Sequence, residues 1–406
     1  MPAEVSAPGA LRRNVLYRNV PITKVWYDAA EAEAVSKPIE SGWVVQGPYT
    51  REFEARFAEF TDVLHAVACT SCTTALHLAL EACGIGPGDE VIVPAFTWVS
   101  TANAVLYAGA TPVFCDIRLD TFNIDPDLVE ALITPRTKAI LPVHLFGYPA
   151  DMPRLLGIAQ KHNLVVIEDA ACGFGSAIYG QHVGTFGEAG CFSFHPRKAI
   201  STGEGGMVIT SDAAIDERCR ILRNHGGSPA SGPPGPHVMG RYAHLGYNYR
   251  LTDIQSALGV AQMGKADAVL AGRRQWAKAY DDALADNPML RIPRVPDGWT
   301  HSYQSYVLLY APEAPTWHNL PRLHAERNAL MARLAEAGIG TRPGTHAVHT
   351  LDYYRKTFGL RPEDAPNAFI ADQCSFAIPL FPQMTDADHA HVAQHLLALT
   401  ASVPVV

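Results

Sequence analysis

The sequence predicts an α/β fold around a largely parallel sheet, and two observations support this prediction. The chain has 406 residues, more than one hydrophobic core usually holds, so we expect two domains. From residue 64 onward, short β-rich runs alternate with helix-like segments, which is typical of a parallel sheet. Ligands of such sheets bind at the carboxyl ends of the strands, so the residues that follow each run are the first candidates for a site.

The strands and helices of the first domain alternate in chain order. Together they predict a large domain over residues 21–265, preceded by a mobile tail over residues 1–20. The expected pairs are HAVAC with TTALHLALEAC, EVIVP with WVSTANAVLYAG, TPVFCDI with DPDLVEALI, and KAILPVHL with MPRLLGIAQKHN; LVVIEDA, a Gly-rich loop, CFSFH and GMVIT follow.

The rest of the chain predicts a smaller α+β domain over residues 266–406. A polar, Gly/Pro-rich insert at 226–242 is expected to be a mobile surface loop. The apolar spacing over residues 251–284 predicts one or two long helices that lead into the second domain. There we expect a strand in SYQSYVLLY and helices near 318–337 and 386–399.

Composition excludes several classes of protein. No uninterrupted apolar run approaches the ~18 residues needed to span a bilayer. The first residues have no apolar core of signal-peptide length, so we expect a cytoplasmic protein. A formal charge of −8 without a basic patch argues against nucleic acid as the main partner. The eight cysteines are scattered among apolar neighbours, which favours reduced thiols over a disulfide framework.

Two charged residues next to apolar runs point to chemistry. Asp169 ends the run LVVIEDA, where a buried carboxylate is costly unless it meets a cation. A helix N-cap or a salt-bridged core aspartate would give the same pattern. Lys198 lies between two β-like runs and beside a glycine turn, and a partly desolvated lysine is suited to forming a Schiff base.

Together the two residues indicate pyridoxal phosphate. This cofactor needs a lysine for its aldehyde, an aspartate for its pyridine nitrogen and an anion cradle for its phosphate. A strand ending at Cys69 and a helix beginning near Thr73 would supply the cradle from backbone N–H groups, aided by the hydroxyls of Ser71 and Thr73. Trp98, after the run EVIVPAFT, is placed to cover the cofactor ring.

From about residue 41 to its end the chain resembles the DegT/StrS-type (DegT/DnrJ/StrS) sugar aminotransferases, pyridoxal-phosphate enzymes of the aspartate aminotransferase fold (fold type I). The resemblance implies that fold for this chain. It rests on several motifs in order and at matching spacing: TSCTTALHLALEACGIGPGDEVIVPAFTWVSTANAV, GATPVFCDI, TKAILPVHLFGYPADM, VVIEDAA, GTFGEAGCFSFHPRKAISTGEGGMVIT, RNHG and LGYNYRLTDIQSALG.

The resemblance also implies roles for individual residues. Lys198 would form the Schiff base, Asp169 would partner the pyridine nitrogen, and Trp98 would stack on the ring. Cys72, Thr73 and Ser193 would surround the phosphate. Asn248 of GYNYR would reach the phosphate of the other subunit, which makes a homodimer the expected active unit.

The chain departs from the family pattern at two cofactor positions. Cys72 stands where relatives commonly have Gly or Ala, and Cys172 stands near the ring hydroxyl where many have Gln. The backbone N–H at residue 72 can still bind phosphate, whereas the side-chain contact at residue 172 is put in doubt. Lys198 is kept where a few relatives have His and act as sugar dehydratases, which favours transamination.

Several residues are candidates for binding substrate. Arg342 could pair with a carboxylate or diphosphate, or form a surface salt bridge. His349 aligns with a family histidine near the sugar-nucleotide site, and His346 lies in the same region. Glu204 either contacts substrate or only shapes its glycine turn. If the run through Lys198 is extended, His195 and Arg197 lie on the opposite side, as supporting or surface groups.

The resulting hypothesis is an L-glutamate-dependent aminotransferase that converts a keto-sugar nucleotide to an amino sugar for a polysaccharide or a glycosylated metabolite. A keto-cyclitol aminotransferase is the nearest alternative, followed by a sugar dehydratase or a regulatory relative. A CxxC redox or metal-binding protein is the alternative from another class, since Cys69 and Cys72 stand at a helix start. We expect no metal: zinc would need two further ligands, and His391 and His395 lack the glutamate of an H-E-x-x-H motif.

Overall fold

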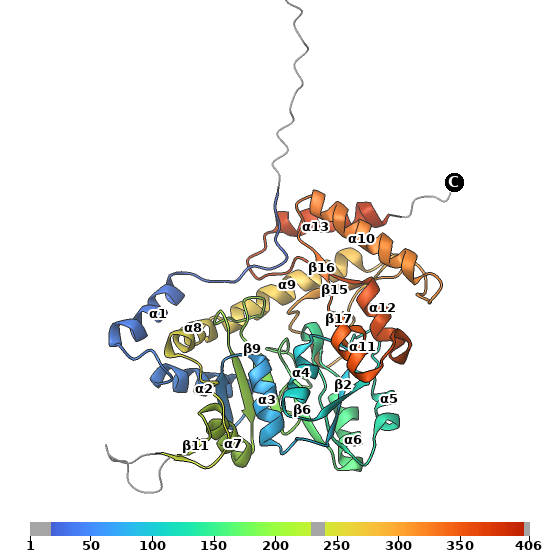
Figure 1. Ribbon diagram of the computed structural model, residues 1–406. Helices are drawn as coiled ribbons and strands as arrows, with labels where there is room; N and C mark the ends of the chain where they lie inside the picture. Colours follow the sequence, from blue (N-terminus) through green and yellow to red (C-terminus); the bar gives the residue numbers. More distant parts are fainter. Residues whose placement is uncertain (1–17, 229–239, 402–406) are drawn as a thin grey trace, which may run out of the picture.

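The computed structural model describes residues 18–228 and 240–401, and Figure 1 shows its arrangement. Within these residues the main sheet has seven strands in the order β1-β10-β9-β6-β5-β2-β4. β10 is antiparallel to both of its neighbours, and the strands from β9 to β4 are parallel, so the predicted mostly parallel α/β class is confirmed. The bounds are β1 His65–Cys69, β2 Glu90–Pro94, β4 Thr111–Cys115, β5 Thr137–Ile140, β6 Val165–Asp169, β9 Ala189–Ser193 and β10 Gly206–Thr210.

Helices cover both faces of this sheet. Successive residues of a strand point to opposite faces, and in β6 Val166 packs toward α6 whereas Ile167 packs toward α3. Consequently Asp169 faces the α3 side and Glu168 the other. The helices of the large domain are α2 Pro48–Thr61, α3 Cys72–Ala82, α4 Ser100–Tyr107, α5 Pro126–Val129, α6 Met152–His162, α7 Ala213–Arg223 and α8 Asp253–Met263.

One expected helix is shorter than the sequence predicts, and the one or two long helices expected over residues 251–284 are two. The segment DPDLVEALI forms only α5 and the 3-10 turn Glu130–Leu132, because Thr134 precedes Pro135 and a residue before proline disfavours the helical conformation. The long helical segment after residue 251 is two helices, α8 and α9 (Ala266–Leu284), which are separated at Gly264.

The C-terminal region forms a second core around a four-stranded antiparallel sheet, in the order β13-β15-β18-β16. Trp276, Tyr280 and Leu284 of α9 pack there against Leu396 of α13. Figure 1 shows α9, α10 and α13 together above the main sheet. The bounds are β13 Leu290–Arg291, β15 Tyr306–Tyr310, β16 Arg342–Pro343, β18 Ser375–Ile378, α10 Leu320–Glu336, α11 Asp352–Phe358, α12 Pro366–Cys374 and α13 Asp386–Thr400.

Two segments join the cores. The backbone of Val20 bridges to Ile339, and Leu380 donates its N–H to the carbonyl of Ile22, so the first described residues lie against the second core. The chain then runs to α1 (Ala29–Ser41), which packs on α8. Strand β17 (His346–Ala347) pairs with β3 (Phe96–Thr97) and places the second core beside the carboxyl end of the main sheet. The division at residues 265/266 stays a prediction.

The remaining paired segments are short: β7 Ala177–Ile178, β8 Gln181–His182, β11 Gly227–Ser228, β12 Arg241–Tyr242, β14 Trp299–Thr300 and the 3-10 turns Leu145–Gly147, Val348–Thr350 and Pro362–Asp364. In the described ranges no helix has both the length and the hydropathy needed to cross a membrane. The predicted tail lies almost wholly outside the described residues, as does the centre of the predicted 226–242 loop.

Candidate active site

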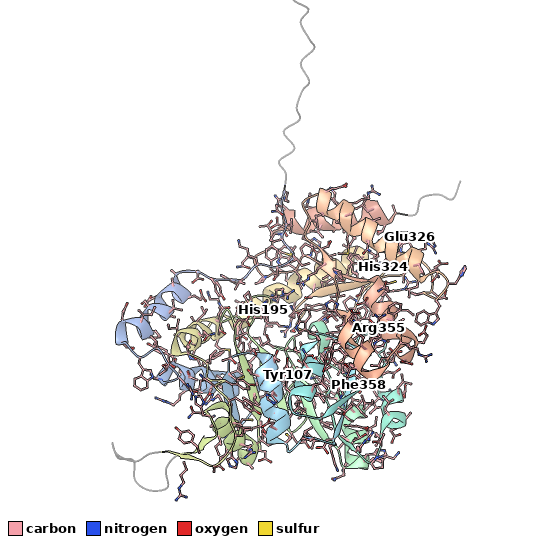
Figure 2. The ribbon with its side chains drawn as sticks, in the orientation of Figure 1. Tyr107, His195, His324, Glu326, Arg355 and Phe358 are labelled. Atoms are coloured by element: carbon pink, nitrogen blue, oxygen red, sulfur yellow. The ribbon has the colours of Figure 1, made fainter. Side chains whose placement is uncertain are left out.

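A cavity of about 420 Å³ opens where the two cores meet, at the carboxyl ends of the parallel strands. Figure 2 labels one of its residues, His195, in the region between the two cores. All but two of the predicted site residues line this cavity: Ser71, Cys72, Thr73, Trp98, Asp169, Cys172, Ser193, Lys198, Glu204 and Arg342.

The turn from β1 into α3 forms an anion cradle. Ser71 caps the helix by accepting the N–H of Thr74, while the Thr74 hydroxyl accepts the N–H of Ser71. The first-turn N–H groups of Cys72 and Thr73 stay available, as expected of a helix N-terminus. Gly206 packs directly under this turn, where an added Cβ would lie 2.3 Å from the Ser71 carbonyl and 2.6 Å from the Cys72 nitrogen. The packing on Gly206 therefore fixes a helix N-terminus at the edge of the cavity, with the geometry that an anion site requires.

Asp169 presents a buried carboxylate to the same cavity. Its side chain accepts the Thr101 hydroxyl at 2.8 Å and the Ala171 N–H at 3.1 Å. Burial raises the pKa of Asp169 above its ordinary value, and the hydrogen bonds from Thr101 and Ala171 offset this only in part. A protonated nitrogen of a bound ring would supply the cation that this carboxylate needs.

The neighbouring Glu168 anchors β6 from the other face. It accepts the N–H groups of Gly184, Phe186 and Gly187 at 2.7–2.9 Å. His144 lies 2.8 Å from the same carboxylate through Nε2, and its Nδ1 accepts the N–H of Ala150. The end of β6 that carries Asp169 is therefore fixed by a buried polar network.

Lys198 lies in a turn after β9 rather than in an extended segment. Its N–H donates to the carbonyl of His195 at 2.8 Å, and Gln304 donates its side-chain N–H to the carbonyl of Arg197. The alternation expected from an extended chain is therefore wrong, because the turn brings His195, Arg197 and Lys198 to one cavity. The Lys198 amine is 3.1 Å from the Cys172 sulfur.

Trp98 forms one wall at the junction between the cores. It follows β3, is 52% exposed, and its ring centroid lies 5.6 Å from that of His346 on β17. Arg342 reaches the cavity from β16. The guanidinium groups of Arg197 and Arg342 thus line the same cavity as the imidazoles of His195 and His346. Besides Asp169, Glu204 is the other residue with a carboxylate that lines this cavity.

Two predicted residues lie away from this cavity. His349 is fully buried beneath a separate, mainly apolar cavity of about 240 Å³, beside Phe114 and Phe358. Asn248 is exposed and stands in sequence between Tyr247 and Tyr249, whose rings stack on each other. Its segment adjoins the turn before α3, because Thr70 donates its N–H to the carbonyl of Tyr249. The structure therefore does not bring His349 to the other site residues.

The CxxC cysteines have the environment of buried structural thiols. Burial raises the pKa of Cys69 to about 11, which opposes thiolate formation. Over residues 18–228 and 240–401 no group of three or more potential metal ligands is found. His391 and His395 instead contact backbone carbonyls.

Sequence reasoning missed Thr101, Gln304 and the pair Glu168–His144. The sequence did carry a signal for Thr101, because this residue follows the strand EVIVP and stands in the first turn of α4, next to residues that line the cavity. Gln304 and His144 come from separate parts of the chain, and their roles depend on packing.

These features fit pyridoxal phosphate, because the cavity offers an amine, a buried carboxylate, an anion cradle and an aromatic wall. The sequence profile of the DegT/DnrJ/EryC1/StrS aminotransferase family matches residues 26–397. The chain belongs to this family.

Relatives of this aminotransferase cover almost its whole length. It is 40% identical over 362 residues to the spore coat polysaccharide biosynthesis protein SpsC of Bacillus subtilis (strain 168). This match covers 88% of this chain and 91% of SpsC. The putative sugar aminotransferase Spr1654 of Streptococcus pneumoniae, in its PMP form, superposes with a TM-score of 0.87 at 28% identity and covers 94% of this chain and 99% of its own.

A third relative is PseC of Helicobacter pylori, an aminotransferase involved in the biosynthesis of pseudoaminic acid. It has a TM-score of 0.85 and 28% identity, and the match covers 95% of this chain and all of PseC. Spr1654 has been solved in a PLP form as well as a PMP form. The predictions of fold type I, of an aminotransferase and of pyridoxal 5′-phosphate as its cofactor are therefore confirmed.

Proposed function

We propose that this aminotransferase transfers the amino group of L-glutamate to a keto-sugar nucleotide and so makes an amino sugar nucleotide. The observation that carries the proposal is the cationic mouth of the cavity, where Arg197 and Arg342 open onto the same space as Lys198. Guanidinium groups suit both the diphosphate of a nucleotide sugar and the carboxylates of glutamate. The relatives SpsC, Spr1654 and PseC, which are a polysaccharide biosynthesis protein, a putative sugar aminotransferase and an aminotransferase of pseudoaminic acid biosynthesis, support a sugar acceptor.

Each part of the cavity has a role in this proposal. The bound cofactor supplies an electron sink and carries the amino group between the two substrates. Asp169 holds the ring nitrogen in its protonated form, and the N–H groups of Cys72 and Thr73 hold the phosphate, with the hydroxyls of Ser71 and Ser193 beside them. Trp98 would cover the ring, and Cys172 would lie near the ring hydroxyl, since both residues line the cavity.

Lys198 is the proposed acid–base group. Its amine lies in the cavity, so with the cofactor bound the free amine would take the proton from the substrate's α-carbon and later give that proton back, acting first as base and then as acid. The turn through His195 and the bond from Gln304 hold this lysine in place during both half-reactions.

The proposed active unit is a homodimer in which Asn248 reaches the phosphate site of the partner subunit. Asn248 is exposed beside the cradle of its own chain. Leu245, three residues earlier in the sequence, is 86% exposed. Trp43 and Val45, between α1 and α2, are also more than half exposed. Apolar side chains of this size at the surface are suited to an interface between subunits.

Substrate contacts are assigned to the rim of the cavity. Arg342 is proposed to pair with the diphosphate, and Glu204 to meet sugar hydroxyls at the opening. The buried His349 is assigned no direct contact. We further propose a cytoplasmic role in the synthesis of amino sugars for a polysaccharide or a glycosylated metabolite.

The test is amino transfer from ¹⁵N-labelled L-glutamate to a panel of keto-sugar nucleotides, with keto-cyclitols in the same panel. We expect label in an amino sugar nucleotide, and the variant Arg342→Met should raise KM for that acceptor more than Arg342→Lys does. The proposal fails if label reaches only a cyclitol, or if no sugar nucleotide accepts it while glutamate still converts the bound cofactor. Reduction with borohydride followed by peptide mapping should find the cofactor on Lys198.

A further inference from the structure

The Lys198 amine lies within hydrogen-bond distance of a thiol. Nζ of Lys198 and Sγ of Cys172 are 3.1 Å apart. Cys172 follows the end of β6 and Lys198 the end of β9, and these two strands are parallel neighbours in the sheet. Both side chains are partly exposed and line the cavity, so a small solute that enters it reaches both of them.

The surroundings of Cys172 are cationic. Arg273 of α9 is 1% exposed, donates to the carbonyls of Tyr303 and Gln304, and interacts electrostatically with Cys172. Cys172 is partly exposed at the cavity surface, where a peroxide can reach its sulfur. The other cavity thiol, Cys72, is buried, and burial and the nearby Asp169 raise the pKa of Cys72 well above its ordinary value, which opposes its oxidation.

We propose that Cys172 and Lys198 form a modification site, in which oxidation of the thiol by a hydroperoxide joins the two side chains through a sulfur–nitrogen bond. In the first step the thiol and hydrogen peroxide give a sulfenic acid and water. In the second step the free amine attacks the sulfur; the S–O bond breaks, the S–N bond forms, and the hydroxyl leaves with an amine proton as water. The pair loses two hydrogen atoms, and the peroxide is reduced to water.

The bond forms only when the lysine amine is free. The inference rests on the proposed role of Lys198, because a lysine already joined to pyridoxal phosphate has no amine to offer. With the cofactor in its pyridoxamine form, the amine is released and lies beside the thiol. An added thiol such as dithiothreitol attacks the sulfur and restores the amine, so the modification is reversible.

Mass spectrometry of the holoenzyme tests this site. The protein is loaded either with pyridoxamine phosphate or with pyridoxal phosphate, treated with hydrogen peroxide, and digested without reductant. We expect a cross-linked pair of peptides containing residues 172 and 198, lighter by two hydrogen atoms, mainly in the pyridoxamine-loaded sample. Dithiothreitol should abolish the cross-link and restore amino transfer. The proposal is overturned if Cys172 advances to its sulfinic acid while Lys198 stays unmodified, or if no cross-link forms.

Two variants separate this pair from other oxidation. Cys172→Gln, which installs the residue common in relatives, should give no cross-link and no dithiothreitol-reversible loss of cofactor conversion by glutamate. Cys83→Ser alters a half-buried thiol at the other end of α3 and should leave the cross-link intact. Persistence of the reversible loss in Cys172→Gln would contradict the proposal.

Failure of this inference can be told apart from failure of the proposed function. Borohydride reduction of the pyridoxal-loaded protein identifies the lysine that holds the cofactor independently of any oxidant. A cofactor on another lysine would overturn the proposed role of Lys198, and pyridoxal phosphate would then fail to protect the pair. A cofactor on Lys198 without any cross-link would overturn the inference alone.

Discussion

The hydroxyl of Thr101 donates a hydrogen bond to the carboxylate of Asp169, with 2.8 Å between Oγ1 and Oδ2. The Thr97 hydroxyl lies 2.9 Å from that of Thr101 and continues the chain of hydrogen bonds. Asp169 ends a buried strand, and Thr101 stands in the first turn of α4. This contact stabilises the charged form of a carboxylate that burial disfavours.

We therefore expect Thr101→Val to weaken cofactor binding about tenfold or more, because a hydrogen bond to a charged group contributes about 1.5–3 kcal/mol. Titration of the apoprotein with pyridoxal phosphate, followed by absorbance, measures the affinity. Thr101→Ser keeps the hydroxyl and should bind nearly as the native protein does. Equal affinity for the valine and native proteins would show that Thr101 has no influence on Asp169.

Asp169→Asn should stabilise the apoprotein at neutral pH although it impairs cofactor binding. Burial raises the pKa of Asp169 above its ordinary value of 3.8, so the folded protein keeps this proton at a pH where the unfolded chain has lost it. The free energy of unfolding therefore falls as pH rises from 3.8 through the raised pKa. Asparagine removes this loss.

Thermal unfolding of both apoproteins between pH 3.5 and 8 measures the difference. We expect no gain for Asp169→Asn at the acid end, a growing gain through the titration range and a constant gain above it. With saturating cofactor the order should reverse, because removing one partner of a buried ion pair costs about 3–5 kcal/mol. An apoprotein destabilised by the change at neutral pH would contradict the prediction.

Gly206→Ala should disturb the phosphate cradle. The added Cβ would overlap the backbone of Ser71 and Cys72, so the turn before α3 must shift. We expect weaker binding of both pyridoxal phosphate and inorganic phosphate, by roughly tenfold or more, since a shift in the turn misaligns donors that depend on geometry. Gly157→Ala in α6, where a Cβ meets no atom within 4 Å, is the matched control and should bind normally. Normal phosphate binding by Gly206→Ala would place the cradle elsewhere.

Glu168→Gln should lower stability by about 3 kcal/mol, since the amide cannot accept all of the hydrogen bonds that the buried carboxylate receives. The midpoint of urea unfolding of the apoprotein measures this loss. Asp282→Asn removes a carboxylate from an exposed i,i+4 pair with Lys278 and should change stability little. Equal midpoints for both variants would mean that the Glu168 network does not stabilise the fold.

The predicted fold class and most cavity residues came from local patterns. Asp169 ends a β-rich run and Ser71 follows another after Thr70, so the carboxyl-edge rule was enough to bring them together, whereas Ser193 came from the family resemblance. Lys198 was found from its position between runs. The alternation around it was conditional on an extended chain, and that condition does not hold, because the strand has ended and the segment is a turn.

His349 shows the limit of positional resemblance. It stands three residues after His346, yet it lies in the 3-10 turn Val348–Thr350, where its buried side chain lines a separate, mainly apolar cavity rather than the site. Thr101 and Gln304 show the opposite case, because neither belongs to a distinctive motif and yet both lie at the site. Their hydrogen bonds join residues that are 68 and 107 positions apart in the sequence.

The sequence by itself determined the alternation of strands and helices, the capped helix start at α3 and the positions of Lys198 and Asp169 after neighbouring strands, because each depends on residues a few positions apart. Only the tertiary structure decided which groups touch: Thr101 with Asp169, Glu168 with His144, and Cys172 with Lys198. Those contacts join the ends of neighbouring strands to each other or to helix α4, and the relative positions of these elements are set by packing of the whole core. The types of side chain in the cavity therefore follow from local sequence patterns, and the contacts that set their protonation and orientation follow from the tertiary fold.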